Sequence, residues 1–182
     1  KWTELKYSQP RTRQYLNREL YRKLYTHLNN WTKGINHEED LYYRQLVRDF
    51  ILVLSNTGMR FGECHQLKWE YINVIPSKLK YPNVKIFIPS HITKTRRERT
   101  TLGMRGDIFK RIKSYSPDTL SHNFVFRKFE SDELVSKKIL YKYWEKIMIE
   151  TGLCNEPVPP TYYTLRHTFI SYRLMYGNVN VF

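Results

Sequence analysis

A long apolar run near the middle of the chain limits the fold more than any other feature. Residues 41–58 read LYYRQLVRDFILVLSNTG. Four apolar residues of this run fall on one stripe at helical spacing: Leu46, Phe50, Val53 and Leu54. Asn56 and Gly58 close the run, and both residue types favour helix ends. We therefore predict a buried helix that stops just before Arg60.

Further apolar patterns predict other helices around this one. They are residues 16–31, 63–69, 107–115, 136–152 and a last helix that begins near Thr161. In the first, three leucines repeat at helical spacing ahead of a stop at Gly34: Leu20, Leu24 and Leu28. In the fourth, four residues are expected to face the core or to cap the helix: Ile139, Tyr143, Ile147 and Gly152.

Between these helices the pattern changes to that of a small sheet. In residues 84–90, the alternation expected of a strand puts Val84, Ile86 and Ile88 on one face and Lys85 and Phe87 on the other. Residues 99–103 form a second short run that ends at Gly103, and the basic segment HITKTRRE lies between the two. We predict an antiparallel hairpin with a basic tip. The expected fold class is mainly α with a small antiparallel β-sheet, an α+β arrangement.

The charge of the chain points to a polyanionic partner. The 182 residues suffice for one well-buried domain, and 31 Lys and Arg against 17 Asp and Glu give a net charge of +14. Nucleic acid leads the candidates, although heparin-binding, ribosomal and membrane-surface proteins share such a balance. Cys64 and Cys154 are far apart, which argues against a zinc cluster or a disulfide framework and fits a reducing compartment. Neither a membrane-spanning run nor a signal peptide is evident.

The last predicted helix carries a group of residues suited to phosphate. Tyr163 lies three and four positions before Arg166 and His167, so it shares a helical face with both. Arginine is planar, permanently charged and able to bind two phosphate oxygens at once. Taken alone, the same pattern is typical of an ordinary amphipathic surface helix.

Two other segments add charged candidates. Arg60 stands behind a glycine, with Glu63 three residues later, and Lys94 lies near the tip of the predicted hairpin. Each has an ordinary alternative, since Arg60 can be a surface arginine after a helix cap and Lys94 a solvated turn lysine. The combination of all three segments is more informative than any one of them.

In order and approximate spacing, the three segments resemble the catalytic domain of the tyrosine recombinases, the phage integrase family. The family motifs read here TGMRFGE, TKTRRER and YTLRHT. The resemblance implies that residues 11–182 are a catalytic domain and that residues 1–10 are a linker from a missing N-terminal core-binding domain. It implies site-specific DNA recombination, either integration or excision, through a 3′-phosphotyrosyl intermediate, with no metal and no other cofactor.

The resemblance also implies roles for individual residues. Arg60 and Arg166 would bind the nonbridging phosphate oxygens and neutralise the charge that grows in the transition state. Lys94 would protonate the departing 5′-oxygen. Glu63 and His167 would support the site.

The chain departs from the family pattern at two points. Tyr163 stands where the family most often has histidine. A tyrosine hydroxyl can donate a hydrogen bond to phosphate but is a poor proton shuttle, so we expect Tyr163 to bind without acid–base work. The nucleophile of the family lies roughly thirty residues after the second arginine, beyond Phe182. Tyr172 and Tyr176 follow Arg166 too closely, so we expect the sequence to be a fragment that binds DNA weakly and cleaves nothing.

The expected partner is double-stranded DNA, and no membrane is involved. Six basic residues are candidates for contacts to the DNA backbone: Lys78, Lys80, Lys85, Arg96, Arg97 and Arg99. The resemblance implies a homo-tetramer on paired DNA sites for the full-length protein, which would belong to a mobile element and act in the bacterial nucleoid or the cytoplasm of a phage-infected host. The alternatives are a non-catalytic DNA-binding integrase remnant and, with similar chemistry, a type IB topoisomerase.

Overall fold

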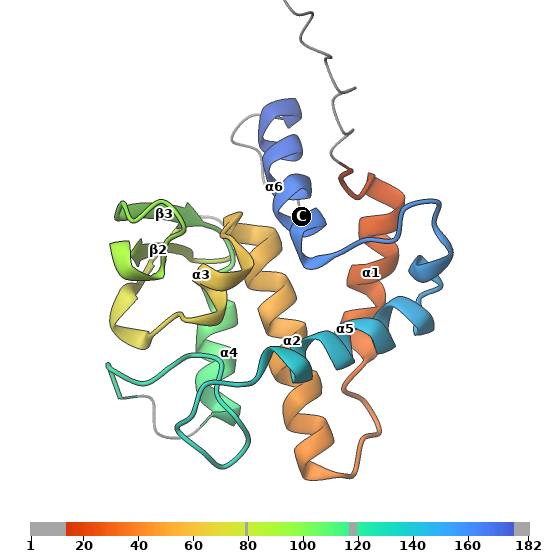
Figure 1. Cartoon of the computed structure of the whole chain (residues 1–182), viewed down its shortest axis with the longest axis horizontal. Helices are drawn as coiled ribbons and strands as arrows, with labels where there is room; N and C mark the ends of the chain where they lie inside the picture. The colour runs from red at the N-terminus through yellow and green to blue at the C-terminus, as the bar shows by residue number, and fades with distance from the viewer. Residues whose placement is uncertain (1–13, 79, 117–119, 177–182) are drawn as a thin grey trace, which may run out of the picture.

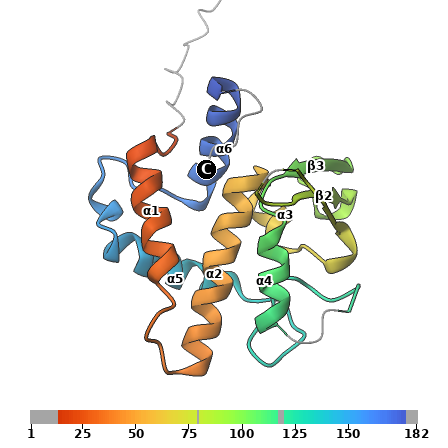
Figure 2. The ribbon, with the colours of Figure 1, turned by 180° about the vertical axis from the view of Figure 1, so that it is seen from behind.

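One central helix organises the molecule. The computed structural model describes residues 14–78, 80–116 and 120–176, so the predicted linker at residues 1–10 lies outside it. Helix α2 (Glu38–Thr57) runs through the middle, with the sheet on one side and helices α1 (Arg18–Asn30) and α5 (Lys137–Glu150) on the other (Figure 1; Figure 2). The predicted class, mainly α with a small antiparallel sheet, is confirmed.

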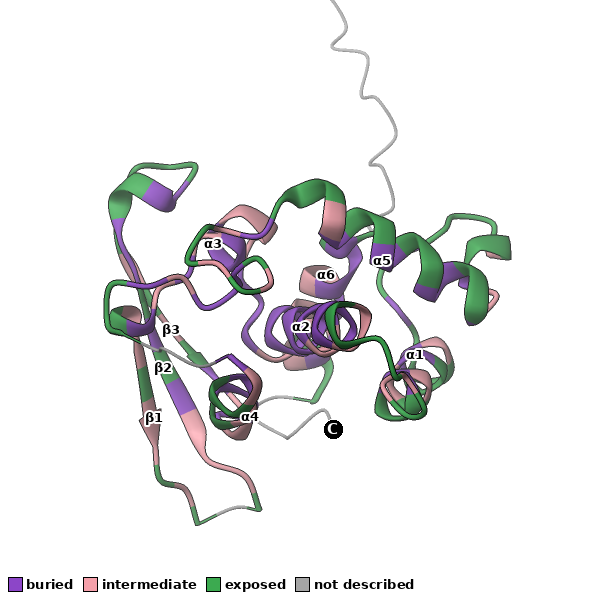
Figure 3. Ribbon diagram, turned by 90° about the horizontal axis from the view of Figure 1, so that it is seen from below, coloured by how far each residue is buried: buried purple, intermediate pink, exposed green. Residues whose placement is uncertain are grey.

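The central helix α2 is buried as its sequence predicts. Leu46, Phe50 and Leu54 are fully buried and Val53 is nearly so, and in Figure 3 the purple of buried residues concentrates on this helix. It begins three residues before the predicted segment, because the ring of His37 accepts a hydrogen bond from the backbone N–H of Asp40 at 3.4 Å. Glu38, Glu39 and Asp40 fill the first turn, where negative charge suits the helix dipole.

The sheet has three antiparallel strands in the order β1 (Ile72–Ile75), β2 (Asn83–Ile88), β3 (Arg99–Gly103). On β2 the predicted alternation holds, since Val84, Ile86 and Ile88 are fully buried while Phe87 is 40% exposed. The sequence did not predict β1, whose four residues are mostly half-buried and show no clear alternation. Strand β1 is instead defined by its pairing with β2, in which Ile72 lies opposite Ile86.

The shorter helices follow the predictions with small shifts. Helix α3 (Phe61–His65) begins two residues before the predicted segment 63–69 and ends four residues before its predicted end, while α4 (Asp107–Tyr115) matches its predicted segment. Helix α1 ends at Asn30, four residues before Gly34. On α5, Ile139 is only half-buried, and Leu140 and Trp144 join Tyr143 and Ile147 in the core. The described residues also form three turns of 3₁₀ helix: Trp69–Tyr71, Ser90–Ile92 and Leu153–Asn155. No helix in the described ranges is long and apolar enough to cross a bilayer.

The last helix, α6 (Tyr162–Tyr176), is fixed at both ends by tyrosine hydroxyls. Tyr162 donates to the carbonyl of Leu140 on α5 at 2.8 Å, and Tyr172 donates to the carbonyl of Leu16 at 3.0 Å. The hydroxyl of Thr168 accepts from the backbone N–H of Leu16 at 2.9 Å. Because these contacts come from two separate segments, α5 and Leu16 ahead of α1, α6 has a defined position against α2.

Candidate active site

The site begins at the sharp corner where α2 ends. Gly58 has φ +63°, a left-handed conformation that glycine adopts without strain, and its N–H donates to the carbonyl of Leu54 at 3.0 Å. The chain then turns directly into α3, with Arg60 as the residue before its first turn. The TGMRFGE segment is therefore a tight corner between α2 and α3, and Arg60 is the N-cap residue of α3.

Glu63 locks this corner from within. Its carboxylate accepts from the backbone N–H of Arg60 at 2.9 Å and from Nη1 of the Arg60 side chain at 2.9 Å. A glutamate at the third helical position satisfies an otherwise unpaired N–H in just this way. This geometry lets Glu63 orient Arg60, and the role predicted for Glu63, support of the site, stays a prediction.

A second arginine reaches the same carboxylate from the sheet. Arg99, the first residue of β3, places Nη2 2.6 Å from Oε2 of Glu63. Glu63 is only 1% exposed. Burial alone would raise its pKa, but the Arg60 N–H and the guanidiniums of Arg60 and Arg99 outweigh it and hold the pKa below its usual value. Glu63 is therefore a buried anion shared by two arginines.

Arg166 arrives from α6, more than a hundred residues further along the chain. Its Nη1 donates to the carbonyl of Gly58, so α6 contacts the corner that holds Arg60. Burial lowers the pKa of Arg166, and the positive charges of Arg60 and Arg99 lower it further, while Glu63 opposes them. An arginine remains charged under such a shift. Arg60 and Arg99 thus bind the Glu63 carboxylate, and Arg166 lies within electrostatic range of all three. We call the corner with Arg60, Glu63 and Arg166 the arginine corner, and its excess positive charge suits an anion.

Gly58 also sets how closely α6 approaches α2. A Cβ at this position would lie 2.3 Å from Cδ1 and 2.8 Å from Cε1 of Phe169. On α6, Leu165 is fully buried, and Phe169 is half-buried with its ring against Gly58. A side chain on residue 58 would separate Arg166 from Arg60.

Tyr163 and His167 lie beside Arg166 on α6. Their rings meet edge to face with centroids 4.4 Å apart, and Tyr163 is 57% exposed. Tyr163 and Arg166 lie within electrostatic range of each other. Tyr163 is thus available to a ligand bound by Arg166.

Lys94 is not part of this contact cluster. It is exposed in the loop of residues 89–98 between β2 and β3, and its ammonium makes no ion pair with any residue in the described ranges. The loop ends at Arg99, however, and Arg99 binds Glu63. Lys94 is therefore tethered to the arginine corner by the residue that closes its loop.

The candidate DNA contacts fall into separate groups. Lys78 and Lys80 lie before β2 and Arg96 and Arg97 lie after it, at opposite ends of the sheet (Figure 3). All four are exposed, as is Lys85 on β2 itself. Arg99 differs from these, because its guanidinium is committed to Glu63 and belongs to the site.

Strand alternation in the sequence places Arg99 on one face of β3, and the structure shows what that face packs on. Alternate residues of a strand share one face, so Arg99, Thr101 and Gly103 lie together on β3. Thr101 donates from its hydroxyl to the carbonyl of Thr57 at 3.2 Å, and Gly103 packs against the Thr57 side chain. This face of β3 lies against the end of α2, which is where the corner begins.

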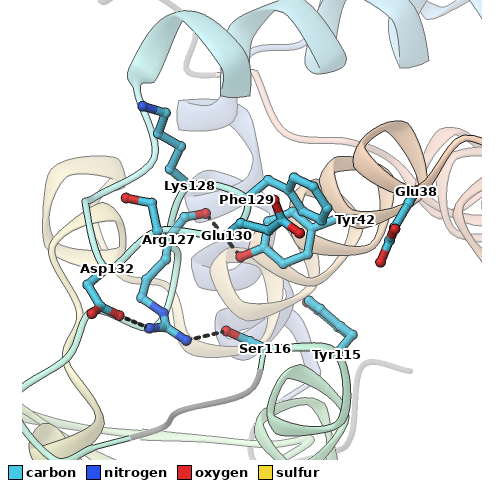
Figure 4. A pocket seen from close by; sticks show the side chains of 10 residues that line it. Glu38, Tyr42, Tyr115, Ser116, Arg127, Lys128, Phe129, Glu130 and Asp132 are labelled. Carbon is cyan, nitrogen blue, oxygen red and sulfur yellow. Dashed lines mark hydrogen bonds and ion pairs between the residues drawn. The ribbon is translucent and has the colours of Figure 1, made fainter.

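A separate cavity of about 340 Å³ lies near the other end of α2 (Figure 4). Its polar groups largely bind one another, since Arg127 contacts Asp132 and donates to Ser116 at 3.1 Å, while Tyr42 donates to the Arg127 carbonyl at 3.1 Å. Tyr42 lies roughly 20 Å along the helix from the arginine corner. This cavity is distinct from the cluster of phosphate-binding candidates.

Two other residues of the motif region are structural. His65 has Nε2 2.7 Å from the carbonyl of Val135, and burial lowers its pKa. Cys64 is fully buried and burial raises the pKa of its thiol, which makes it an unreactive core residue. Among the described residues no group of three or more His, Cys, Asp and Glu side chains is placed to hold a metal ion.

Comparison with known proteins places this geometry in a family. The model of the phage integrase family matches residues 14–181. The chain belongs to the phage integrase family. The match confirms the predicted resemblance to the tyrosine recombinases, the phage integrase family. No curated protein sequence matches the chain significantly.

Solved structures of integrase-type recombinases share the fold. XerH site-specific recombinase bound to its difH substrate matches with TM-score 0.64 at 21% identity, over 88% of this chain and 43% of the XerH chain. The Tn1549 transposon integrase in complex with circular intermediate DNA matches with TM-score 0.57 at 15% identity, over 91% and 53%. The Flpe–Holliday junction complex matches with TM-score 0.55 at 15% identity, over 87% and 40%. This chain therefore spans about half or less of each of these recombinases.

Proposed function

We propose that the chain is the catalytic domain of a site-specific tyrosine recombinase, which cuts and rejoins double-stranded DNA through a 3′-phosphotyrosyl intermediate. The observation that carries the proposal is that Arg60 and Arg99 bind the buried carboxylate of Glu63, while Arg166 donates to the Gly58 carbonyl of the same corner. The net charge of +14 supports a polyanionic substrate.

In the proposed reaction, a tyrosine oxygen attacks the scissile phosphorus and the bond from phosphorus to the 5′-oxygen breaks. Arg60 and Arg166 bind the nonbridging oxygens, on which negative charge grows as the transition state forms. A 5′-hydroxyl of another strand then attacks the phosphotyrosine and releases the tyrosine. The phosphodiester energy is kept in the protein–DNA bond, so this exchange requires no ATP.

Lys94 would donate the proton that the departing 5′-oxygen takes up. Its exposure on a loop at the edge of the arginine corner supports this role, because the ammonium can approach a bound phosphate without displacing a protein partner. Tyr163 would donate a hydrogen bond to a phosphate oxygen, and His167 would hold the Tyr163 ring.

We further propose that the nucleophilic tyrosine follows Phe182 in a longer protein. Tyr172 is a poor candidate, since it is 3% exposed, donates to the Leu16 carbonyl and has a pKa raised by burial. Tyr163 precedes Arg166 by less than one helical turn. The full-length protein would act as a homo-tetramer on two paired DNA sites, in the cytoplasm of a bacterium or of a phage-infected host.

The experiment that tests the proposal replaces each arginine in the full-length protein. We expect Arg60→Ala and Arg166→Ala each to lower the rate of cleavage of a duplex carrying the recombination site by at least about a thousandfold, because the lost contacts strengthen in the transition state. DNA affinity should stay within about tenfold, since one phosphate contact among several is lost. Arg22→Ala, an exposed arginine on α1, is the charge-matched control.

The same measurement separates the rival functions. A DNA-binding remnant without catalysis would bind the duplex but give no covalent product in the unmodified protein. A topoisomerase would relax supercoiled DNA without a preferred site. An arginine variant that cleaves at the unmodified rate would refute the assignment of the arginine corner as the active site.

A further inference from the structure

Arg99 occupies the junction between the arginine corner and the loop that carries Lys94. It is the first residue of β3 and pairs with Ile88, the last residue of β2, so residues 89–98 form a loop closed at this pair. Its side chain extends from the β3 face that packs on the end of α2. The Arg99 guanidinium therefore links the base of the loop to the arginine corner.

The contact partner of Arg99 is the residue that also orients Arg60. Oε2 of Glu63 accepts from Arg99 Nη2 at 2.6 Å and from the Arg60 N–H at 2.9 Å, while Oε1 accepts from Arg60 Nη1 at 2.9 Å. Glu63 is nearly inaccessible to water, whereas the side chains of Arg60 and Arg99 are each about one third exposed. A buried carboxylate with fixed partners is a rigid anchor for both arginines.

Hydrogen bonds within the loop couple the position of its base to the position of Lys94. The hydroxyl of Thr93 lies 3.0 Å from the carbonyl of Ser90 and 3.1 Å from the carbonyl of Arg97, which joins the two arms of the loop. Ile92 and Thr93 are buried, and Lys94 follows them directly. Movement of the β3 arm at Arg99 would therefore shift Arg97, Thr93 and then Lys94.

We propose that Arg99 is a positioning residue that holds the Lys94 loop against the arginine corner through Glu63. The inference deepens the function proposed above and rests on it for the role of Lys94. Without Arg99, the β3 arm loses its charged link to the corner, while Glu63 keeps both of its contacts with Arg60. The loop then opens more often, and Lys94 spends less time near the scissile phosphate.

Amide hydrogen exchange of the 182-residue chain tests the link without DNA. The reporters are the N–H groups of Ile92, Thr93 and Arg96, which donate within the loop to Pro89, Ser90 and Thr93. In Arg99→Ala we expect these amides to exchange about tenfold faster than in the unmodified chain, and in Arg97→Ala, which removes the same charge from the same loop, by less than about twofold. Arg99→Lys should restore part of the protection. Equal exchange in the two alanine variants would overturn the proposal.

Cleavage by the full-length protein tests the consequence for Lys94. A substrate with sulfur at the bridging 5′-position loses a thiolate, which departs without a proton, so it bypasses the need for a general acid. We expect Arg99→Ala, like Lys94→Ala, to cleave the oxygen substrate slowly and to recover at least about tenfold on the sulfur substrate. Arg60→Ala should not recover. A defect in Arg99→Ala that is equal on both substrates would mean a direct phosphate contact and would overturn the positioning role.

The exchange and cleavage experiments together distinguish failure of the positioning role of Arg99 from failure of the proposed recombinase function. If the unmodified protein cleaves neither substrate, the proposed recombinase function fails, and the exchange data still decide whether Arg99 holds the loop. If cleavage occurs and Arg99→Ala behaves as the unmodified protein does on both substrates, the function stands and the positioning role is refuted.

Discussion

Substitution of Gly58 by alanine tests how the corner brings Arg60 and Arg166 together. Alanine at position 58 destabilises the folded protein in two separate ways. The first is the left-handed backbone, φ +63°, which costs a residue with a Cβ roughly 1–2 kcal/mol. The second is the Phe169 ring, whose Cδ1 would lie 2.3 Å from the new Cβ. To reach an ordinary carbon–carbon separation, the ring must move by about 1.3 Å.

Gly34 provides a matched control for the first penalty. It has φ +72°, and a Cβ there would meet nothing within 4 Å, so Gly34→Ala pays only for the backbone. Overpacking against Phe169 should add about 1–3 kcal/mol in Gly58→Ala. For a domain of this size, a 2 kcal/mol difference corresponds to roughly 4–8 °C in Tm. Thermal unfolding of the two variants measures the difference directly.

The displacement should also affect catalysis. Because Phe169 and Arg166 share α6, a shift of about 1 Å in this helix moves Arg166 away from Arg60 and should lower cleavage by the full-length protein roughly a hundredfold. Gly34→Ala should leave cleavage unchanged. Adding Phe169→Leu to Gly58→Ala should recover part of the stability. Equal Tm losses for Gly58→Ala and Gly34→Ala would refute the claim that Phe169 against Gly58 sets the spacing.

Two further predictions concern the core and its pH dependence. Asp49→Ala should cost about 3 kcal/mol in urea unfolding, because the fully buried carboxylate binds Arg111 and accepts from the Tyr115 hydroxyl at 2.9 Å. Asp132→Ala, which removes an exposed partner of a buried arginine, should cost less, and equal losses would contradict the reasoning. The pKa of His65 should lie below 6.5 by NMR titration, because burial disfavours its charged form. As the pH falls below about 6.5, the unfolded chain binds a proton that the folded chain does not, so stability should decrease there, and less so in His65→Gln.

The sequence predicts the elements that depend on local pattern. The apolar stripe of α2 and the alternation on β2 appear in the structure because one face of each packs on the core. The stop at Gly58 was also predictable, since a glycine after a helical run commonly adopts the left-handed backbone. Family motifs identified Arg60 and Arg166, which the fold brings to one corner.

The features that the sequence did not predict depend on contacts between distant segments. Strand β1 has little pattern of its own and is defined by its register with β2. Arg99 resembles its basic neighbours Arg96 and Arg97 in sequence, and only the packing of β3 on the end of α2 directs it to Glu63. Burial of Glu63 is likewise a property of the folded corner, where Arg60 and Arg99 bind it from two different segments.

Identification of the covalent intermediate tests the central claim most directly. The full-length protein would be incubated with genomic DNA fragments from its source, denatured in detergent, digested and examined by mass spectrometry for a nucleotide attached to the protein. We expect a tyrosine after Phe182 linked to a DNA 3′-phosphate, formed by the unmodified protein and lost in Arg166→Ala. A link through a 5′-phosphate, a link to Tyr163 or the absence of any covalent product would contradict it.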